Sequence, residues 1–78
     1  MGFRTVIIKT RAKLASRLNY LIIRSDRGEN KIYLSEINTL IIQSTAVSMT
    51  AALLNDLTKE NVKIIFCDEK HNPFGELL

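Results

Sequence analysis

The stretch that decides the fold is residues 38–67, NTLIIQSTAVSMTAALLNDLTKENVKIIFC. Its first part, 38–43, contains three consecutive large apolar residues, a pattern typical of a strand that is covered on both faces. Over 48–60 the apolar residues recur every three or four positions, which predicts an amphipathic helix. Residues 62–67 return to a β-branched apolar run. A strand, a helix and a strand of these lengths predict a crossover between two parallel strands.

The ends of this helix carry recognisable signals. Ser48 is the predicted N-cap, and Asn61 tolerates the left-handed conformation that ends a helix. Upstream, turn residues at Asn19 and Gly28 separate short apolar runs. These runs predict strands at 5–9, 12–18, 20–24 and 31–34. We therefore expect an α+β, mainly β domain, a small mixed sheet or β-sandwich-like fold of about six strands with one crossover helix.

Length and composition limit the class of protein. The 78 residues are 46% hydrophobic and 24% charged, which fits one packed domain spanning 1–78 and excludes a disordered chain. Cys67 is the only cysteine, so an internal disulfide is excluded and a cytoplasmic location is expected. No apolar run approaches the roughly 20 residues of a membrane span, so we expect no membrane partner.

Charge is unevenly distributed along the chain. Residues 1–31 carry eight Lys or Arg against two acids, whereas residues 32–78 carry three against six. A basic half favours an anionic partner, either a nucleic acid or an acidic protein. The basic residues Lys9, Arg11, Lys13 and Arg17 share a parity, so on one extended ribbon they would form a row on one face that could contact phosphates. A turn near 10–12 would break that row, and outward charges on a solvated sheet explain the residues equally well.

Two tyrosines, Tyr20 and Tyr33, could stack on bases, although an aromatic content of 6% and the lack of an RNP motif argue against an RNA-recognition sheet. Catalytic signals are weaker. A run of polar residues at 68–71, DEKH, follows Cys67, but no second His or Cys exists to complete a metal site. We interpret 68–71 as a polar turn and Cys67 as a core side chain. Glycine-rich phosphate loops are absent from the sequence.

Several runs in order resemble the N-terminal β domain of the Cas1 family, the CRISPR-associated endonucleases that integrate new spacers in antiviral defence. They are Arg4-Thr5-Val6-Ile7-Ile8, Lys13-Leu14, Leu34-Ser35-Glu36-Ile37, Glu60-Asn61-Val62 and Ile65-Phe66-Cys67-Asp68. The first and last runs look most like type II systems, in which the enzyme works beside the Cas9 nuclease. The resemblance covers nearly the whole chain.

This resemblance implies a β domain that helps to form a homodimer and lies along double-stranded DNA. It implies Cas2 as a partner and, for the parent enzyme, magnesium or manganese held by a Glu, a His and an Asp in a C-terminal helical domain. That domain is absent from this chain, so we assign no catalytic residue and no metal ligand here, and Asp68, Glu69 and His71 do not match the metal motif. No activity is expected of this chain alone.

The basic row and the resemblance together indicate which residues contact DNA. We expect Lys9, Arg11, Lys13, Arg17 and Tyr20 to contact DNA. Arg11 stands where type II relatives have a His that wedges the duplex end, so this chain favours phosphate binding there, and Tyr20 is the candidate substitute for stacking.

Two other functions stay open at this point. The first is a small protein-interaction module whose basic half docks an acidic partner. The second is a free-standing nuclease built on Asp68, Glu69 and His71, which predicts metal-dependent cleavage by the chain itself.

Overall fold

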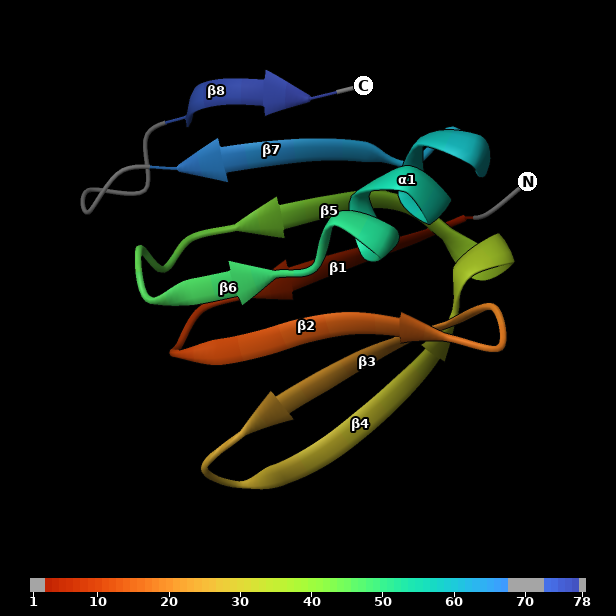
Figure 1. Ribbon diagram of the computed structural model, residues 1–78. Helices are drawn as coiled ribbons and strands as arrows, with labels where there is room; N and C mark the ends of the chain where they lie inside the picture. The colour runs from red at the N-terminus through yellow and green to blue at the C-terminus, as the bar shows by residue number, and fades with distance from the viewer. Residues whose placement is uncertain (1–2, 68–72, 78) are drawn as a thin grey trace.

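The structure is a computed structural model that describes residues 3–67 and 73–77 (Figure 1). Within these residues the chain forms eight strands, one α-helix and one short 3-10 helix. In chain order they are β1 (Arg4–Ile8), β2 (Ala12–Arg17), β3 (Tyr20–Ser25), β4 (Gly28–Tyr33), η1 (Leu34–Glu36), β5 (Ile37–Ile42), β6 (Val47–Met49), α1 (Ala51–Lys59), β7 (Lys63–Cys67) and β8 (Pro73–Leu77). The expected α+β, mainly β class is confirmed.

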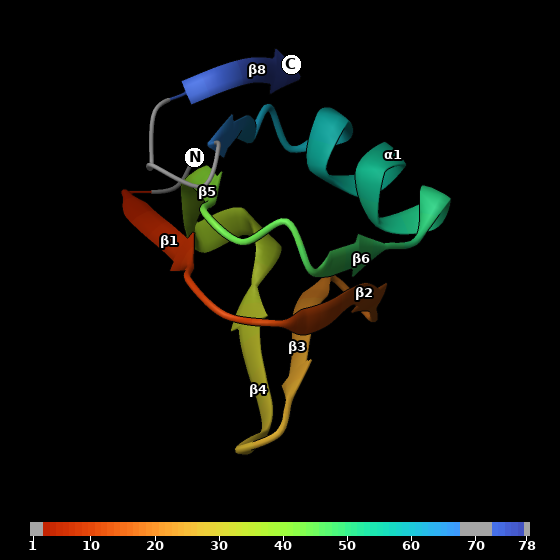
Figure 2. The ribbon, with the colours of Figure 1, turned by 90° about the vertical axis from the view of Figure 1, so that its left-hand side faces the viewer.

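The strands form two four-stranded sheets. Sheet A has the order β1-β5-β7-β8, and sheet B has the order β4-β3-β2-β6. In sheet A, β5 pairs in parallel with both β1 and β7, so the predicted crossover between parallel strands is confirmed. Figure 2 shows α1 beside β6 and β7 on one side of the molecule, and the β3–β4 hairpin extending away from sheet A.

One hydrophobic core lies between the sheets and α1. It joins side chains that are at most 1% exposed from every layer: Leu14 and Leu21 of sheet B, Leu40 and Ile64 of sheet A, and Leu53 and Leu57 of α1. The helix contributes because its two leucines are one turn apart on the same face. Burial of this apolar surface is the main favourable term that holds the two sheets together. Within the described part of the chain, no helix is long and apolar enough to cross a membrane.

The helix begins later than the sequence pattern predicted. Ser48 lies in β6, opposite Lys13 of β2 in a parallel pair, so its backbone belongs to sheet B and it is not the N-cap. Thr50 is the N-cap instead, and its Oγ1 accepts a hydrogen bond from the Leu53 N–H at 3.1 Å. At the other end, Asn61 has φ of 59°, as predicted. The predicted helix of 48–60 is therefore wrong at its start because a short strand pairing competes with the first turn.

Two further expectations need correction. The described residues contain eight strands and not about six, because β6 and β8 each add an edge strand to a sheet. The strand at 38–43 was expected to be covered on both faces, but only Leu40 and Ile42 are buried, whereas Ile41 is half-buried. Its neighbour in β1, Ile7, is 44% exposed. The reason is that α1 packs between the sheets, so the other face of sheet A lacks a covering helix among the described residues.

Candidate nucleic-acid interface

Two tight hairpins set the side-chain arrangement of sheet B. The turn between β2 and β3 consists of Leu18 and Asn19, which both have positive φ, 51° and 66°. The turn between β3 and β4 is followed by Gly28, with φ of 122°. In both cases two residues join the paired strand ends, which leaves little freedom for the register. The two turns therefore determine which side chains of β2, β3 and β4 lie on the same face.

The face of sheet B that points away from the core carries cationic and aromatic side chains in rows. One row is Arg17, Tyr20 and Tyr33, and the next is Ala15, Ile22 and Lys31. A third row is Lys13, Arg24 and Glu29. We call this surface the outer face of sheet B. The outer face carries one carboxylate, that of Glu29, and four cationic side chains, those of Lys13, Arg17, Arg24 and Lys31. Glu29 Oε1 accepts a 2.7 Å hydrogen bond from Arg24 Nε.

The four basic residues singled out in the sequence do not form one continuous row. Lys9 and Arg11 lie in the connection where the chain leaves β1 of sheet A and enters β2 of sheet B. Lys13 and Arg17 are exposed on the outer face of sheet B, while Ala12 and Leu14 on the opposite side of β2 are buried. Odd-numbered residues therefore share one face only within β2, because the chain passes from sheet A to sheet B at residues 9–11.

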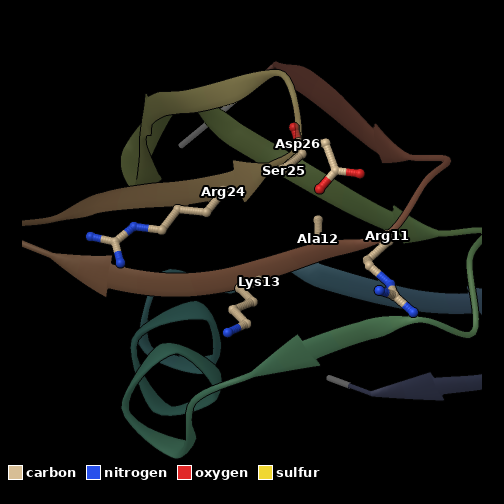
Figure 3. A pocket seen from close by; sticks show the side chains of 6 residues that line it. All are labelled: Arg11, Ala12, Lys13, Arg24, Ser25 and Asp26. Atoms are coloured by element: carbon tan, nitrogen blue, oxygen red, sulfur yellow. The ribbon is translucent and has the colours of Figure 1, made fainter.

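The basic residues line two shallow depressions. A pocket of about 210 Å³ is bordered by Arg11, Lys13 and Arg24, with Asp26 as its acid. In Figure 3 the three cationic side chains point in different directions around Ala12, so their charges are spread over the surface. A larger groove of about 490 Å³, between β1 and β4, is bordered by Lys9.

The four cations of the predicted strip have no acidic partner, among the described residues, that would compete with a bound anion. Among residues 3–67 and 73–77, ion pairs involve Arg4 with Glu36 at 3.9 Å and Arg24 with Glu29 at 2.7 Å. None is found there for the strip itself, which comprises Lys9, Arg11, Lys13 and Arg17. The two ion pairs that do form, Arg4–Glu36 and Arg24–Glu29, are exposed and therefore weak, so either arginine can exchange its carboxylate for another anion. This surface can therefore exchange water and counterions for phosphate oxygens.

Candidate metal ligands are not assembled in the described part of the chain. No three His, Cys, Asp or Glu side chains gather within residues 3–67 and 73–77. Cys67 is 5% exposed and free, as expected of a core side chain. The polar run of Asp68, Glu69, Lys70 and His71 lies outside the described residues.

Comparison with known proteins agrees with this fold. The family model of the CRISPR-associated protein Cas1 matches residues 5–78. The chain belongs to the Cas1 family. A curated relative, the CRISPR-associated endonuclease Cas1 of Neisseria meningitidis serogroup C (strain 8013), is 28% identical over 78 residues, which is 100% of this chain and 26% of the relative. The chain thus spans about a quarter of the length of the relative it matches.

Solved Cas1 structures share the fold. A Cas1 protein from Thermotoga maritima superposes with a TM-score of 0.85 at 15% identity, covering 95% of this chain and 24% of that protein. A complex of TtCas1 with DNA gives 0.87 at 13% identity, covering 99% and 29%. A partial Cas6-RT-Cas1–Cas2 complex gives 0.85 at 17% identity, covering 99% and 23%.

Within this Cas1 fold, the structure adds residues that the sequence pattern did not connect with the strip. Arg24 lies directly opposite Lys13, and Tyr33 lies directly opposite Tyr20. Lys31 lies in the row between these two pairs. Counting outward in register from the two-residue turns would have found all three, because each turn determines which residues face each other across the hairpin.

Proposed function

We propose that this chain is the N-terminal β domain of a CRISPR spacer-acquisition integrase, and that it contacts the backbone of double-stranded DNA and joins a second copy. Family membership supports the integrase context. A solved Cas1 neighbour in complex with DNA supports the ligand class. The observation that carries the proposal is a surface with four exposed, unpaired cations at Lys9, Arg11, Lys13 and Arg17, counted among the described residues.

Backbone binding of this kind has a measurable signature. Each phosphate that a cation neutralises on duplex DNA contributes about 0.9 to the slope of log K against log salt. Reversing all four charges should therefore flatten the slope by up to about 3.6. Sequence preference should not change, because phosphates carry no base identity.

The experiment is a salt titration of duplex binding by fluorescence anisotropy, using the 78-residue chain. Arg17→Glu on the outer face is compared with Lys59→Glu at the exposed end of α1, which makes the same change of charge on a different element. We expect a lower slope for the first variant and an unchanged slope for the second. Equal slopes for the two variants and the unaltered chain would remove Arg17 from the contact surface, and an unchanged slope after all four charges are reversed would exclude the whole strip.

The dimer part of the proposal rests on the open edge of sheet B. β4 is the terminal strand of that sheet and borders the groove of about 490 Å³. The Leu34 N–H donates to the Asn19 carbonyl at 2.8 Å, which places even-numbered residues of β4 with their backbone groups toward β3. The backbone N–H and C=O groups of the odd-numbered residues, Glu29, Lys31 and Tyr33, then point to the open edge, where another strand can pair.

Charge selects one symmetric register for a second copy. Antiparallel pairing centred on Asn30 places Glu29 opposite Lys31 of the second copy, and the reverse, so both contacts are attractive. Moving the centre to Glu29 or to Lys31 places like charges opposite each other. A register shifted by one residue from any of these would place the core-facing side chains of one copy on the same face as the outward side chains of the other.

Sedimentation velocity tests this interface. Glu29→Lys and Lys31→Glu should each weaken association, and the double swap should restore it because both pairs become attractive again. Glu60→Lys, the same charge change at the exposed end of α1, is the control and should leave the mass unchanged. A monomer at every concentration, or single variants that associate like the unaltered chain, would contradict pairing through β4.

The remaining parts of the proposal concern the parent protein. We propose Cas2 as its partner, which a neighbour that contains both Cas1 and Cas2 supports, and we propose a cytoplasmic location. The magnesium or manganese of the parent enzyme would need ligands beyond the described residues, which gather no group of three.

An interaction module for an acidic protein is the alternative function, and a competition experiment separates it from DNA binding. Heparin and duplex DNA should displace each other from this chain, whereas an acidic protein alone should compete in the alternative.

A further inference from the structure

The first strand, β1, is an open edge of sheet A. Among the described residues it pairs with β5 alone, and Figure 2 shows it on the side of the molecule away from α1. The Gln43 N–H donates to the Ile8 carbonyl at 2.8 Å, so the backbone groups of Ile8, and of Val6 two residues earlier, point toward β5. Those of Thr5 and Ile7 therefore point to the open edge, where a further strand can pair.

The sequence of β1 does little to prevent such pairing. Sheet edges are commonly blocked by a proline, a charged side chain or a bulge. Residues 5–8 are Thr-Val-Ile-Ile, with neither proline nor charge. Their register with β5 is regular, and the irregularity of this pair lies before them, between Arg4 and Thr5. Ile7, in the middle of this edge, is 44% exposed. A regular, uncharged and partly apolar edge of this kind can accept another strand.

A groove of about 490 Å³ lies between this edge and β4, the edge of sheet B. Its lining includes four apolar side chains from the two sheets, those of Val6, Ile8, Ile23 and Ile32. Val6 and Ile8 are buried, and Ile23 and Ile32 are half-buried against the same core. A strand added to β1 would place every second side chain over this apolar floor, because side chains alternate between the two faces of a sheet.

The charges of the groove indicate the other side chains of such a strand. Among the described residues its lining holds three cations, Arg4, Lys9 and Lys31, and no acid. Arg4 is paired with Glu36 at 3.9 Å, whereas Lys9 and Lys31 have no ion pair within the described part of the chain. The same lining contains no aromatic ring, so it offers a nucleic-acid base no stacking surface. Acidic side chains that alternate with apolar ones are the complementary pattern.

We propose that the groove between β1 and β4 binds an extended acidic segment of another protein. The segment pairs with the backbone of β1 as an additional strand of sheet A. Its apolar side chains lie on the floor of the groove, and its carboxylates lie beside Lys9 and Lys31. This inference goes beyond the proposed function, because main-chain pairing at β1 requires no DNA. The second copy is proposed to pair through β4, so the two associations use different strand edges.

A synthetic probe of six residues that alternates valine and glutamate tests this pairing, since it can span the five residues of β1. It carries a fluorescein label, and the 78-residue chain is titrated into it while fluorescence anisotropy is measured. We expect saturable binding. A probe that alternates serine and glutamate should bind more than about 10-fold more weakly, a factor that corresponds to the burial of one valine. A probe that alternates valine and lysine should also bind more weakly, because the lining of the groove is cationic.

N-methylated probes test main-chain pairing without altering the protein. The N–H groups of alternate residues in a strand point to opposite edges, so methylation of the valines and methylation of the glutamates block opposite edges of the probe. One of these two probes should lose binding and the other should retain it. The one that loses binding also shows whether the added strand is parallel or antiparallel to β1. Equal binding by the two probes would overturn strand addition.

Hydrogen exchange locates the probe on the protein. The amide hydrogens of Thr5 and Ile7 face the open edge of β1, and they should exchange more slowly when the valine–glutamate probe is bound. The amide hydrogens of Glu29, Lys31 and Tyr33 face the open edge of β4 and should be unaffected. Protection of these three instead would place the probe on β4 and overturn the proposal.

A charge variant and the state of association complete the test. Lys9→Glu should weaken binding of the valine–glutamate probe by about 2- to 5-fold, the range of an exposed ion pair, whereas Lys59→Glu at the exposed end of α1 should not. Equal affinities for these two variants would remove the carboxylates from this groove. A probe that binds only where sedimentation velocity shows a monomer would assign the groove to a second copy. Either result, or no binding to the unaltered chain, would overturn the proposal.

Discussion

Removing the hydroxyl of Ser16 should loosen the attachment of α1 to sheet B. Ser16 Oγ in β2 donates a hydrogen bond of 2.7 Å to Asp56 Oδ2 in α1, and both residues are half-buried. A hydrogen bond to a charged group contributes about 1.5–3 kcal/mol, and the abandoned carboxylate would remain partly desolvated. A chain of this size has a total stability of roughly 4–12 kcal/mol, so Ser16→Ala should remove a large fraction of it.

Urea and thermal unfolding followed by far-UV circular dichroism measure this effect. A loss of about 2 kcal/mol lowers Tm by roughly 8–16 °C in a domain of this length. Thr58→Ala is the matched control, because the Thr58 Oγ1 donates at 2.8 Å to the Leu54 carbonyl within the same helix but in an exposed position. That variant should change stability by no more than about 0.5 kcal/mol.

A double-mutant cycle completes the test. Ser16→Ala, Asp56→Ala and the double variant should show a coupling free energy above about 1 kcal/mol, since the two side chains are in direct contact. A coupling near zero, or a loss in Ser16→Ala no larger than in Thr58→Ala, would refute the view that this contact anchors the helix.

Three further predictions concern the turns and the core. Leu18 has φ of 51° and is 82% exposed, so Leu18→Asn should stabilise the chain by up to about 1 kcal/mol in urea unfolding, and a loss of stability would show that the leucine packs in the folded chain. At Gly28, with φ of 122°, an added Cβ meets no atom within 4 Å, so Gly28→Ala should cost about 1–3 kcal/mol from backbone strain alone, and a neutral result would contradict that conformation. Leu40 is fully buried, so Leu40→Ala should lower the free energy of unfolding by about 2–5 kcal/mol, whereas Ile7→Ala on the half-open face of sheet A should cost less, and equal losses would contradict the assigned core.

Much of the fold could be predicted from local patterns. The β-branched run at 62–67, the apolar strand at 38–43 and the helical period between them predict a parallel pair without any knowledge of the rest of the chain. Asn61 likewise takes the positive φ angle expected of it, and Gly28 lies at the predicted turn. These features depend on neighbours in sequence, which is why a sequence pattern can predict them.

The start of α1 shows where such patterns stop. Ser48 and Met49 fit the helical period, yet both lie in β6 because β2 offers a partner strand there. The candidate interface follows the same logic. Lys9, Arg11 and Lys13 are all at odd positions, but the chain passes from sheet A to sheet B before Lys13. Alternation along a strand therefore does not predict that the three side chains share a face.

The sequence by itself determined the strand and helix periods, the excess of positive charge in residues 1–31 and the Cas1 resemblance, because each depends on residue types and short spacings. The pairs Tyr20–Tyr33 and Lys13–Arg24 follow from the register that the two-residue turns set, whereas only the tertiary structure brought Asp56 within 2.7 Å of Ser16. Ser16 and Asp56 are 40 positions apart, and they meet because burial of one common core sets the positions of both sheets and α1.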